Sequence, residues 1–376
     1  QLAQRGWQVA VIDGATHPAA GASGVPAAIF APHHSPDDSV ISRLSRAGVR
    51  ATLQALHQLA SDLQGTAWDM HGVLEHAVEP GARLAGDSGA WQPWTHPASA
   101  AERAQARLDT DAPALWHASA GWLRPAALVA RLLAQPGVTV RAGLAVAKIE
   151  AADARWRLTD ARGAPIAEAE CVVVCAGPAS ARLIGRRLPL QPVRGMASWG
   201  LHTPHTAAAP WPEVPVNGHG NLIPRVPLAG GEAWVCGSTF ERDQACLPLS
   251  EGEITAAHRA NFTKLQLLLP ALAVALQPVF AAPVAPRLQA WSGVRCTTPD
   301  HLPLVGPLDG AVQPGLWLCT GLGARGATLA LLCAELLAAR LHDEPLPLDA
   351  ALGRAISTER LARAAQSTTA APSSRS

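Results

Sequence analysis

Gln8-Val9-Ala10-Val11-Ile12-Asp13 is a short apolar run that ends in an acid. Such a run is typical of a buried parallel strand. The residues before it read as the last turn of a helix, with Gly6 as its stop. We therefore expect the second half of a βαβ unit whose first strand and Gly-rich turn are not in the 376 residues. In dinucleotide-binding folds an acid at this position accepts hydrogen bonds from ribose hydroxyls. Asp13 is thus a candidate, and a solvated acid at a strand end is the alternative.

Helices and strands alternate along the rest of the chain. The patterns predict helices at 39–63, 126–134, 251–276 and 327–341, strands between 138 and 175, at 196–199, 233–236 and 316–320, and a turn-rich segment at 293–307. Meanders lie between the βα pieces, which indicates a mixed α/β chain of two interleaved domains.

Composition excludes several classes of protein. Hydrophobic residues make up 48% of the 376 residues and charged residues 16%, which excludes a disordered chain or a coiled coil. The net charge of +1 gives no global field for nucleic acid, so contact with RNA would need a local Arg patch. The chain has no Tyr, which excludes a Tyr acid, base or carboxylate contact. It has two Lys, Lys148 and Lys264, which leaves little room for Schiff-base chemistry.

Cysteine usage and hydropathy predict a cytoplasmic protein that does not enter a membrane. The seven Cys form no CxxC pair, and we read them as reduced, buried thiols. No basic-then-apolar signal opens the chain. The longest apolar stretch, 265–282, is interrupted by Pro270 and Pro278, so we expect a packed helix and a loop there.

Gly321-Leu-Gly-Ala-Arg-Gly326 matches the spacing GxGxxG between a predicted strand and helix. No second βα unit follows, so it is not a standard dinucleotide turn. It remains a Gly-rich loop at a helix N-terminus, which can bind an anion such as a reduced flavin. A tight packing turn is the alternative.

Isolated polar residues supply the candidate chemistry. Arg295 lies in the turn-rich segment and can bind a carboxylate through two parallel N–H bonds, or form a surface ion pair. His219 can act as an acid or base, or stabilise a turn. The crowded loop from His33 to Asp38 lacks metal-ligand spacing, so we expect no metal site.

A set of ordered motifs covers nearly the whole chain, up to about Arg360. The motifs are Gly21-Ala-Ser-Gly24, Ala31-Pro-His33, Ser35-Pro-Asp-Asp38, Trp122-Leu-Arg-Pro125, Arg194-Gly195, Asn217-Gly-His-Gly220, Gly237-Ser-Thr-Phe-Glu-Arg-Asp243, Gly293-Val-Arg-Cys-Thr-Thr-Pro-Asp300 and the 321–326 loop. This set resembles the FAD-dependent oxidoreductase half of the bifunctional tRNA wobble-uridine enzymes of the MnmC family. More broadly, it resembles the glycine oxidase and D-amino-acid oxidase superfamily. Met196 departs from the pattern, because we expect a polar residue there and a hydrogen bond that Met cannot make.

The resemblance implies FAD as cofactor and a role for particular positions. The adenosine ribose would lie at Asp13 and adenine at the backbone of Val146, with the pyrophosphate along Ala176–Gly177 and the flavin pyrimidine under 323–328. Arg295 matches the Arg that binds the substrate carboxylate. The full cofactor-binding set is Asp13, Gly21, Ser23, Gly24, Val146, Ala176, Gly177, Gly321, Gly323, Arg325, Gly326, Ala327 and Thr328.

The resemblance also implies a division into domains. The FAD-binding domain would comprise residues 1–45, 118–190 and 288–360, and the β-rich substrate domain residues 46–117 and 191–287. Residues 366–376 are rich in Ser, Thr and Ala, which predicts a disordered tail.

The implied activity is the oxidative removal of the carboxymethyl group from 5-carboxymethylaminomethyl(-2-thio)uridine at the tRNA wobble position. The products would be 5-aminomethyl(-2-thio)uridine and glyoxylate. The implied partners are tRNA and a SAM-dependent methyltransferase domain, fused or separate. Two alternatives stay open. One is a small-molecule oxidase of the glycine, D-amino-acid or sarcosine type. The other is an inactive fragment that cannot hold FAD and contacts tRNA through Arg43, Arg46 and Arg50.

Overall fold

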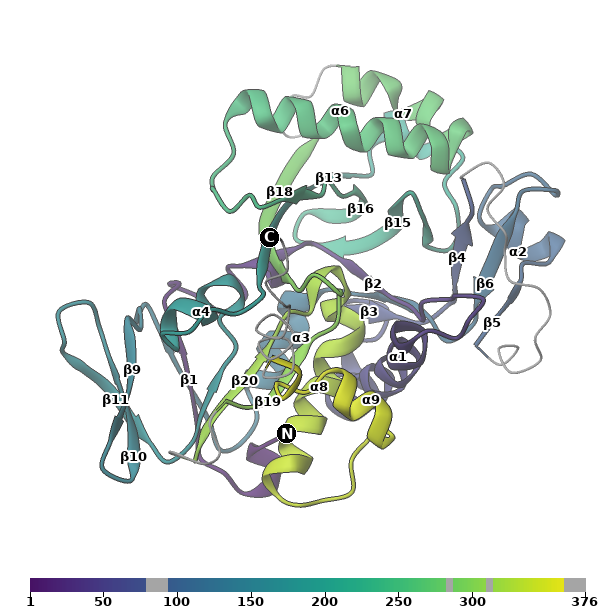
Figure 1. The fold of residues 1–376 in the computed structure, drawn as a ribbon. Helices are drawn as coiled ribbons and strands as arrows, with labels where there is room; N and C mark the ends of the chain where they lie inside the picture. The colour runs from purple at the N-terminus through teal and green to yellow at the C-terminus, as the bar shows by residue number, and fades with distance from the viewer. Residues whose placement is uncertain (79–93, 282–286, 309–313, 362–376) are drawn as a thin grey trace, which may run out of the picture.

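The computed structural model describes residues 1–78, 94–281, 287–308 and 314–361. Figure 1 shows two layers of structure: a large sheet under a pair of helices, and below it a group of smaller sheets and helices. The mixed α/β architecture that the sequence predicts is confirmed.

Short parallel pairs form the centre of the lower part. The strand β1 (Val9–Asp13) pairs with β8 (Val138–Ala142), and β12 (Val172–Val174) pairs with β20 (Leu316–Thr320). On its other side β20 pairs antiparallel with β19 (Leu304–Pro307). The two strands of each parallel pair end at the same edge, so the loops that follow them meet there.

Two long helices pack on one another beside these strands. They are α1 (Val40–Leu59) and α8 (Gly326–Leu341). A Cβ on Gly48 would collide with the carbonyl of Thr328, so only Gly permits this approach. The hydroxyl of Thr52 donates to the carbonyls of Ala327, at 3.1 Å, and Thr328, at 3.2 Å, which fixes α1 against the start of α8.

Smaller elements complete the lower part. The helices are α3 (Pro125–Leu133), α4 (Ser180–Leu183) and α9 (Ala350–Ala355), with the 3-10 turns η1 (Ala3–Arg5), η2 (Ala22–Gly24), η3 (Ser61–Leu63), η4 (Gly177–Ala179) and η5 (Gly323–Arg325). One three-stranded sheet has β9 (Lys148–Ala152), β10 (Arg155–Thr159) and β11 (Pro165–Ala169), and another has β2 (Ala28–Phe30), β7 (Gly121–Leu123) and β3 (Trp68–Asp69).

The upper part is a nine-stranded sheet. Its order is β17 (Glu241–Arg242), β13 (Gln191–Leu201), β16 (Gly231–Gly237), β15 (Gly220–Leu228), β14 (Val216–Gly218), β4 (Val73–His76), β6 (Ala114–His117) and β5 (Thr95–Pro97), with β18 (Gln289–Thr297) also paired to β13. The helices α6 (Glu251–Leu268) and α7 (Pro270–Ala281) cover one face (Figure 1), and the short helices α2 (Ala100–Gln105) and α5 (Pro204–Ala207) connect strands.

The two faces of this sheet have different neighbours. Leu74, Val216 and Leu222 are buried in one cluster with Leu265 and Leu268 of α6. Residues on the opposite face of the sheet form a second cluster with residues in or next to β2 and β7. The sheet supplies Ala197, Ile223, Val226 and Val235, and the lower part supplies Ala27, Ile29 and Trp122. The face away from α6 and α7 is therefore the one that meets the lower part of the molecule.

Two predicted elements are wrong in their extent. The predicted helix 251–276 is two helices, because Pro270 lacks an N–H donor and disfavours a helical conformation at Leu269, which has φ −144° and ψ 77°. The predicted turn-rich segment begins too early, since 293–297 belong to β18, which pairs along β13 from Gln191 to Trp199. Strand pairing over that length overrides the turn propensity of Gly293.

The seven cysteines differ in how exposed they are. All seven Cys are free. Three of them are buried, but Cys171 and Cys319 are half-buried and Cys175 and Cys246 are exposed, so the prediction of burial is wrong for these four. The boundary placed at 45/46 falls inside the continuous helix α1, and the rest of the domain division stays a prediction.

The tail 366–376 lies outside the described residues. In the described part of the chain, no helix is long and apolar enough to cross a membrane.

Candidate active site

Two loops and the end of β18, from distant parts of the chain, meet at the carboxyl ends of β12 and β20. A Cβ on Gly177, after β12, would lie 3.6 Å from Cβ of Cys296. A Cβ on Gly323, after β20, would lie 3.2 Å from Oγ1 of Thr297. The end of β18 therefore lies against both loops. In α/β folds, ligands bind outside the carboxyl ends of parallel strands, so this edge is the expected ligand position.

The loop after β20 leads into the N-terminus of α8. Gly321 and Gly323 have φ values of 78° and 57°, a left-handed conformation that favours glycine. A Cβ on Gly326, the first residue of α8, would meet no atom within 4 Å. Open space therefore lies beside the first residue of a 16-residue helix, and the N-terminus of a helix suits an anionic ligand. The hydroxyl of Thr328 accepts from the N–H of Ala31 at 3.4 Å.

The loop predicted to approach the flavin lies against β18. A Cβ on Gly293 would lie 3.4 Å from Cα of Ala22, and a Cβ on Gly24 would lie 3.3 Å from Nε1 of Trp291. Gly21 and Ser23 are exposed, and a Cβ on Gly21 would also meet no atom within 4 Å. The turn η2 therefore reaches the same strand that carries Arg295.

Asp13 and the Val146 segment form a second group at the end of β1. The carbonyl of Asp13 accepts from the N–H of Leu144 at 3.0 Å, and a Cβ on Gly14 would lie 3.5 Å from Cβ of Ala145. One carboxylate oxygen of Asp13 accepts from the N–H of Ala15 at 2.9 Å. The predicted ribose and adenine contacts thus lie close together in space.

These features fit a dinucleotide cofactor. Asp13 and Val146 would hold its adenosine, and Ala176–Gly177 and the N-terminus of α8 its phosphates and flavin, and these assignments stay predictions. The hydroxyl of Ser180, buried just beyond Gly177, has no hydrogen-bond partner among the described residues. A buried orphan hydroxyl is expected to bind a group from outside the chain.

Arg295 lies on β18, the strand that contacts these loops, and Arg325 lies within the loop after β20 itself. The Nη2 of Arg295 donates to the hydroxyl of Ser238 and its Nη1 to the carbonyl of Thr239, at 3.3 Å. It forms no ion pair with any described carboxylate. Burial lowers the pKa of the guanidinium from its usual value. A half-buried cation whose charge is not neutralised favours an anionic ligand.

Lys264, on α6, reaches the same segment from the other side. Its Nζ donates to the carbonyl of Ser238 at 2.7 Å. Burial lowers the pKa of Lys264, and the charge of Arg295 lowers it further. Two cations thus converge on Ser238, which increases the positive potential available to a carboxylate at Arg295.

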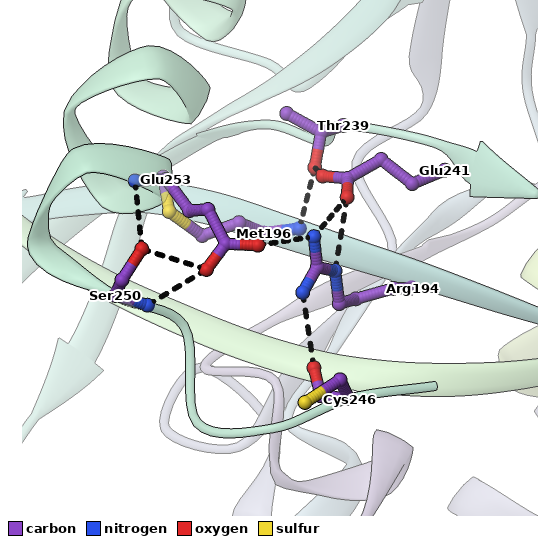
Figure 2. A network of polar contacts seen from close by, with 7 residues as sticks. All are labelled: Arg194, Met196, Thr239, Glu241, Cys246, Ser250 and Glu253. Carbon is purple, nitrogen blue, oxygen red and sulfur yellow. Dashed lines mark hydrogen bonds and ion pairs between the residues drawn. The ribbon is translucent and has the colours of Figure 1, made fainter. Parts of the chain in front are cut away.

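An ion-pair network around the buried side chain of Arg194 holds the segment that Arg295 contacts. Figure 2 shows Arg194 between Glu241 and Glu253, which it contacts at 2.6 Å and 2.7 Å, and its third bond goes to the carbonyl of Cys246 at 3.0 Å. In the same view the hydroxyl of Thr239 accepts from the N–H of Met196 at 2.8 Å. These bonds fix residues 239–241 and so the acceptor of the Arg295 guanidinium.

Two further predictions concern residues near this network. The side chain of Met196 is fully buried against Leu249 and Ala257, in an apolar environment that suits Met rather than a polar residue. His219 lies exposed in the turn between β14 and β15 and forms no hydrogen bond with the described residues. Its catalytic role stays a prediction.

The Arg residues of α1 line a separate cavity of about 290 Å³, together with Trp94. Arg43 pairs with Asp349 at 2.8 Å and Arg46 with Asp38 at 2.9 Å, while Arg50 lies over the ring of Trp94. Two of the three charges are thus already neutralised. This arrangement is close to the solvated helix face expected of such a pattern.

Sequence reasoning did not assign a role to several residues that surround Arg295. Ser238 and Thr239 supply its acceptors, Lys264 adds a charge and Gly195 makes room for it. Three of the four lie in quoted motifs, so the signal was present in the sequence. Lys264 lies in an ordinary amphipathic helix and carries no such signal.

Comparisons with known proteins show which family the chain is similar to. Residues 1–340 match the model of the family described as FAD dependent oxidoreductase. Two similar curated proteins are named tRNA 5-methylaminomethyl-2-thiouridine biosynthesis bifunctional protein MnmC. The one from Acidovorax sp. (strain JS42) is 50% identical over 367 residues, and the one from Paracidovorax citrulli is 53% identical over 370 residues. The matches cover 96% of this chain in both cases, but 57% and 58% of the relatives.

Solved structures of amine and amino-acid oxidases share the fold. Glycine oxidase from Geobacillus kaustophilus has a TM-score of 0.67 at 20% identity, with 91% of this chain and 90% of that chain covered. Iminodiacetate oxidase from Chelativorans sp. BNC1 has a TM-score of 0.67 at 24% identity, with 92% of each chain covered.

Proposed function

The chain belongs to the FAD dependent oxidoreductase family, and on that premise we propose that it oxidises an N-carboxymethyl group on the wobble uridine of tRNA. The chain spans a little over half the length of the MnmC relatives that it matches. The substrate would be 5-carboxymethylaminomethyl(-2-thio)uridine, and the products the 5-aminomethyl base and glyoxylate.

The reaction balances as a two-electron oxidation followed by hydrolysis. The CH2 between nitrogen and carboxylate loses a hydride, the C=N bond that forms takes up water, and the C–N bond breaks to release glyoxylate. Bound FAD supplies the two-electron acceptor. The protein has to bind the carboxylate, orient the CH2 and admit the amine in its neutral form.

One observation carries the proposal: the guanidinium of Arg295 is half-buried, held by Ser238 and Thr239, and paired with no described carboxylate. It lies on β18, the strand that also contacts η2 and the loops after β12 and β20. A glycine-type carboxylate bound there by two parallel N–H bonds would place its CH2 next to the cofactor loops. Because the chain has no Tyr, no Tyr hydroxyl can share this contact.

The partners follow from the same proposal. Substrate tRNA would present its wobble base as an unstacked, single-stranded nucleotide in the anticodon loop. A methyltransferase domain, fused or separate, would act on the resulting amine, and the cytoplasm is where tRNA meets both activities.

The test compares Arg295→Ala and Arg295→Lys with the unchanged chain on RNA that carries the modified uridine. Glyoxylate release and mass spectrometry of the base report turnover, and visible absorbance reports FAD content. We expect Arg295→Ala to lose about a hundredfold or more in kcat/KM at equal FAD content, and Arg295→Lys to retain part of the activity. The exposed Arg225, which pairs with Glu232 at 2.5 Å, supplies the control Arg225→Ala.

Unchanged turnover in Arg295→Ala would overturn the role of the clamp. Turnover of glycine or sarcosine without turnover of the RNA would overturn the tRNA substrate and favour a small-molecule oxidase. A chain that stays colourless after added FAD would contradict the oxidase reading altogether.

A further inference from the structure

One face of the large sheet, the face from which Arg295 projects, carries a row of polar side chains on β15, β14 and β4. Leu74, Val216 and Leu222 contact α6 on the covered face. Because side chains alternate along a strand, the next residues, Glu75, Asn217 and Asn221, lie on the opposite face. The strand pairing aligns them: Glu75 is opposite Asn217, and Asn217 is opposite Asn221.

Arg295 projects from the same face. Its guanidinium lies over Gly195, where a Cβ would be 2.8 Å from Cζ. Gly195 and Ala197 share a face of β13, and Ala197 packs with Ile223, which shares a face of β15 with Asn221. Arg295 and the two amides are thus on one face of the sheet. That face is directed toward η2 and the loops after β12 and β20, and away from α6 and α7.

The two amides on this surface have no hydrogen-bond partner among the residues that the structure describes. Asn217 and Asn221 are half-buried, and neither side chain forms a hydrogen bond with a described residue. The third Asn of the chain behaves differently. Asn261 is fully buried, and its Nδ2 donates to the carbonyl of Met196 and the hydroxyl of Ser198, both at 3.0 Å. The donors and acceptors of Asn217 and Asn221 are therefore available to a polar ligand.

The row ends at a carboxylate that is already paired. Glu75 accepts from Nε2 of His117 at 2.9 Å, and Nδ1 of His117 contacts the hydroxyl of Thr95 at 2.8 Å. Glu75 is therefore held in place and limits the surface on that side. In the strand order, Asn221 and Asn217 lie between Arg295 and Glu75, so a ligand that extends from Arg295 toward Glu75 would pass over the two amides.

We propose that Asn217 and Asn221 bind the Watson–Crick edge of a pyrimidine base whose side chain is held by Arg295. Uracil presents an N–H donor between two acceptors, and a primary amide presents both a donor and an acceptor. Directly opposed residues on adjacent strands have Cβ atoms about 5 Å apart, so two amides can contact different atoms of one ring. This inference rests on the proposed function and names the part of the substrate that the two amides recognise.

The test uses two substrates that share the glycine moiety and differ in the edge of the ring. One is the nucleoside 5-carboxymethylaminomethyluridine, and the other is N-benzylglycine, whose ring has no hydrogen-bonding edge. For Asn217→Ala and Asn221→Ala we expect kcat/KM on the nucleoside to fall about ten- to a hundredfold, with the value for N-benzylglycine changed less than about twofold. Arg225→Ala, a change at an exposed position of β15, should alter neither substrate.

Each other outcome has one meaning. Equal losses on both substrates would show a structural role for the amides and overturn the inference. Unchanged turnover of both substrates would overturn it too, while leaving the proposed function intact. If the unchanged chain oxidises N-benzylglycine but neither the nucleoside nor the modified RNA, the proposed function fails and the inference fails with it.

Discussion

Gly195 lies directly beneath the guanidinium of Arg295. A Cβ on Gly195 would be 2.8 Å from Cζ of Arg295 and 2.7 Å from the carbonyl oxygen of Thr239. Both distances are shorter than carbon can approach these atoms without displacement. The position of the proposed clamp therefore depends on a residue whose own side chain is a single hydrogen atom.

We predict that Gly195→Ala displaces Arg295 and lowers kcat/KM for an N-substituted glycine by about a hundredfold, because a shift of about 1 Å costs that much in an oriented reaction. Steady-state kinetics at matched FAD content measure the effect. Gly252→Ala, in α6, is the control, since a Cβ there meets no atom within 4 Å. Full activity of Gly195→Ala would show that the guanidinium is not held where the substrate needs it.

Gly326→Ala tests the cofactor position. The backbone of Gly326 has φ −55° and its Cβ would meet open space, so the protein without FAD should be as stable as before, or more stable by up to about 1 kcal/mol. Bound FAD would need that space, so we expect its Kd to rise about tenfold or more. Fluorescence titration with FAD and thermal unfolding separate the two effects. An unchanged Kd would place the cofactor elsewhere.

Glu253 should contribute to stability in acid. Its carboxylate accepts from the N–H of Ser250 at 2.9 Å, from the hydroxyl of Ser250 at 2.8 Å and from Arg194 at 2.7 Å. These bonds, in that order, lower the pKa of Glu253 from 4.5 to about 2. A lowered pKa stabilises the folded state above the unfolded value, and the stabilisation is lost as pH falls from 4.5 toward 2.

Glu253→Gln should therefore unfold more easily than the unchanged chain near neutral pH, and the difference should shrink as pH falls through that window. Chemical denaturation at several pH values measures it. Two stability curves that stay parallel down to pH 2 would contradict the assignment, because Gln has no proton to gain.

His117 should stabilise the fold through Glu75. Burial alone would raise the pKa of Glu75, but the hydrogen bond and charge of His117, with the fields of His33 and His34, lower it overall. Arg325 also lies within range of Glu75. His117→Leu would leave the carboxylate without its donor, at a cost of about 1–3 kcal/mol near pH 7. In His117→Leu, burial would raise the pKa of Glu75. Below that pKa the carboxyl group is protonated and no longer needs the donor.

Denaturant unfolding at pH 7 and pH 4 checks this prediction, and the loss should be larger at pH 7. His205→Leu, a change at an exposed position, should stay within about 0.5 kcal/mol of the unchanged chain at both pH values. Equal losses at the two pH values would mean that His117 acts by packing alone.

The local sequence pattern predicted the strands and the helix whose ends carry the proposed cofactor contacts. The apolar run before Asp13, the strand at 316–320 and the helix after Gly326 appear close to their predicted bounds, because hydrophobic periodicity and Gly punctuation act within a few residues. Where longer-range pairing competes with local propensity, prediction failed. The segment 293–297 has turn-like residues but lies in β18, because β13 supplies a partner for every residue of that strand.

Arg295 as a candidate carboxylate ligand, the Gly-rich loop at 321–326 and the absence of Tyr were properties of the sequence itself. Their significance for the site came from tertiary structure. Gly195 and Arg295 are a hundred residues apart, and Glu75 and Asn217 are further apart still, yet strand pairing places the members of each pair on one surface. Which side chains share a face, and which polar atoms stay without partners, depends on register between distant strands, and that register is formed only when the whole sheet folds.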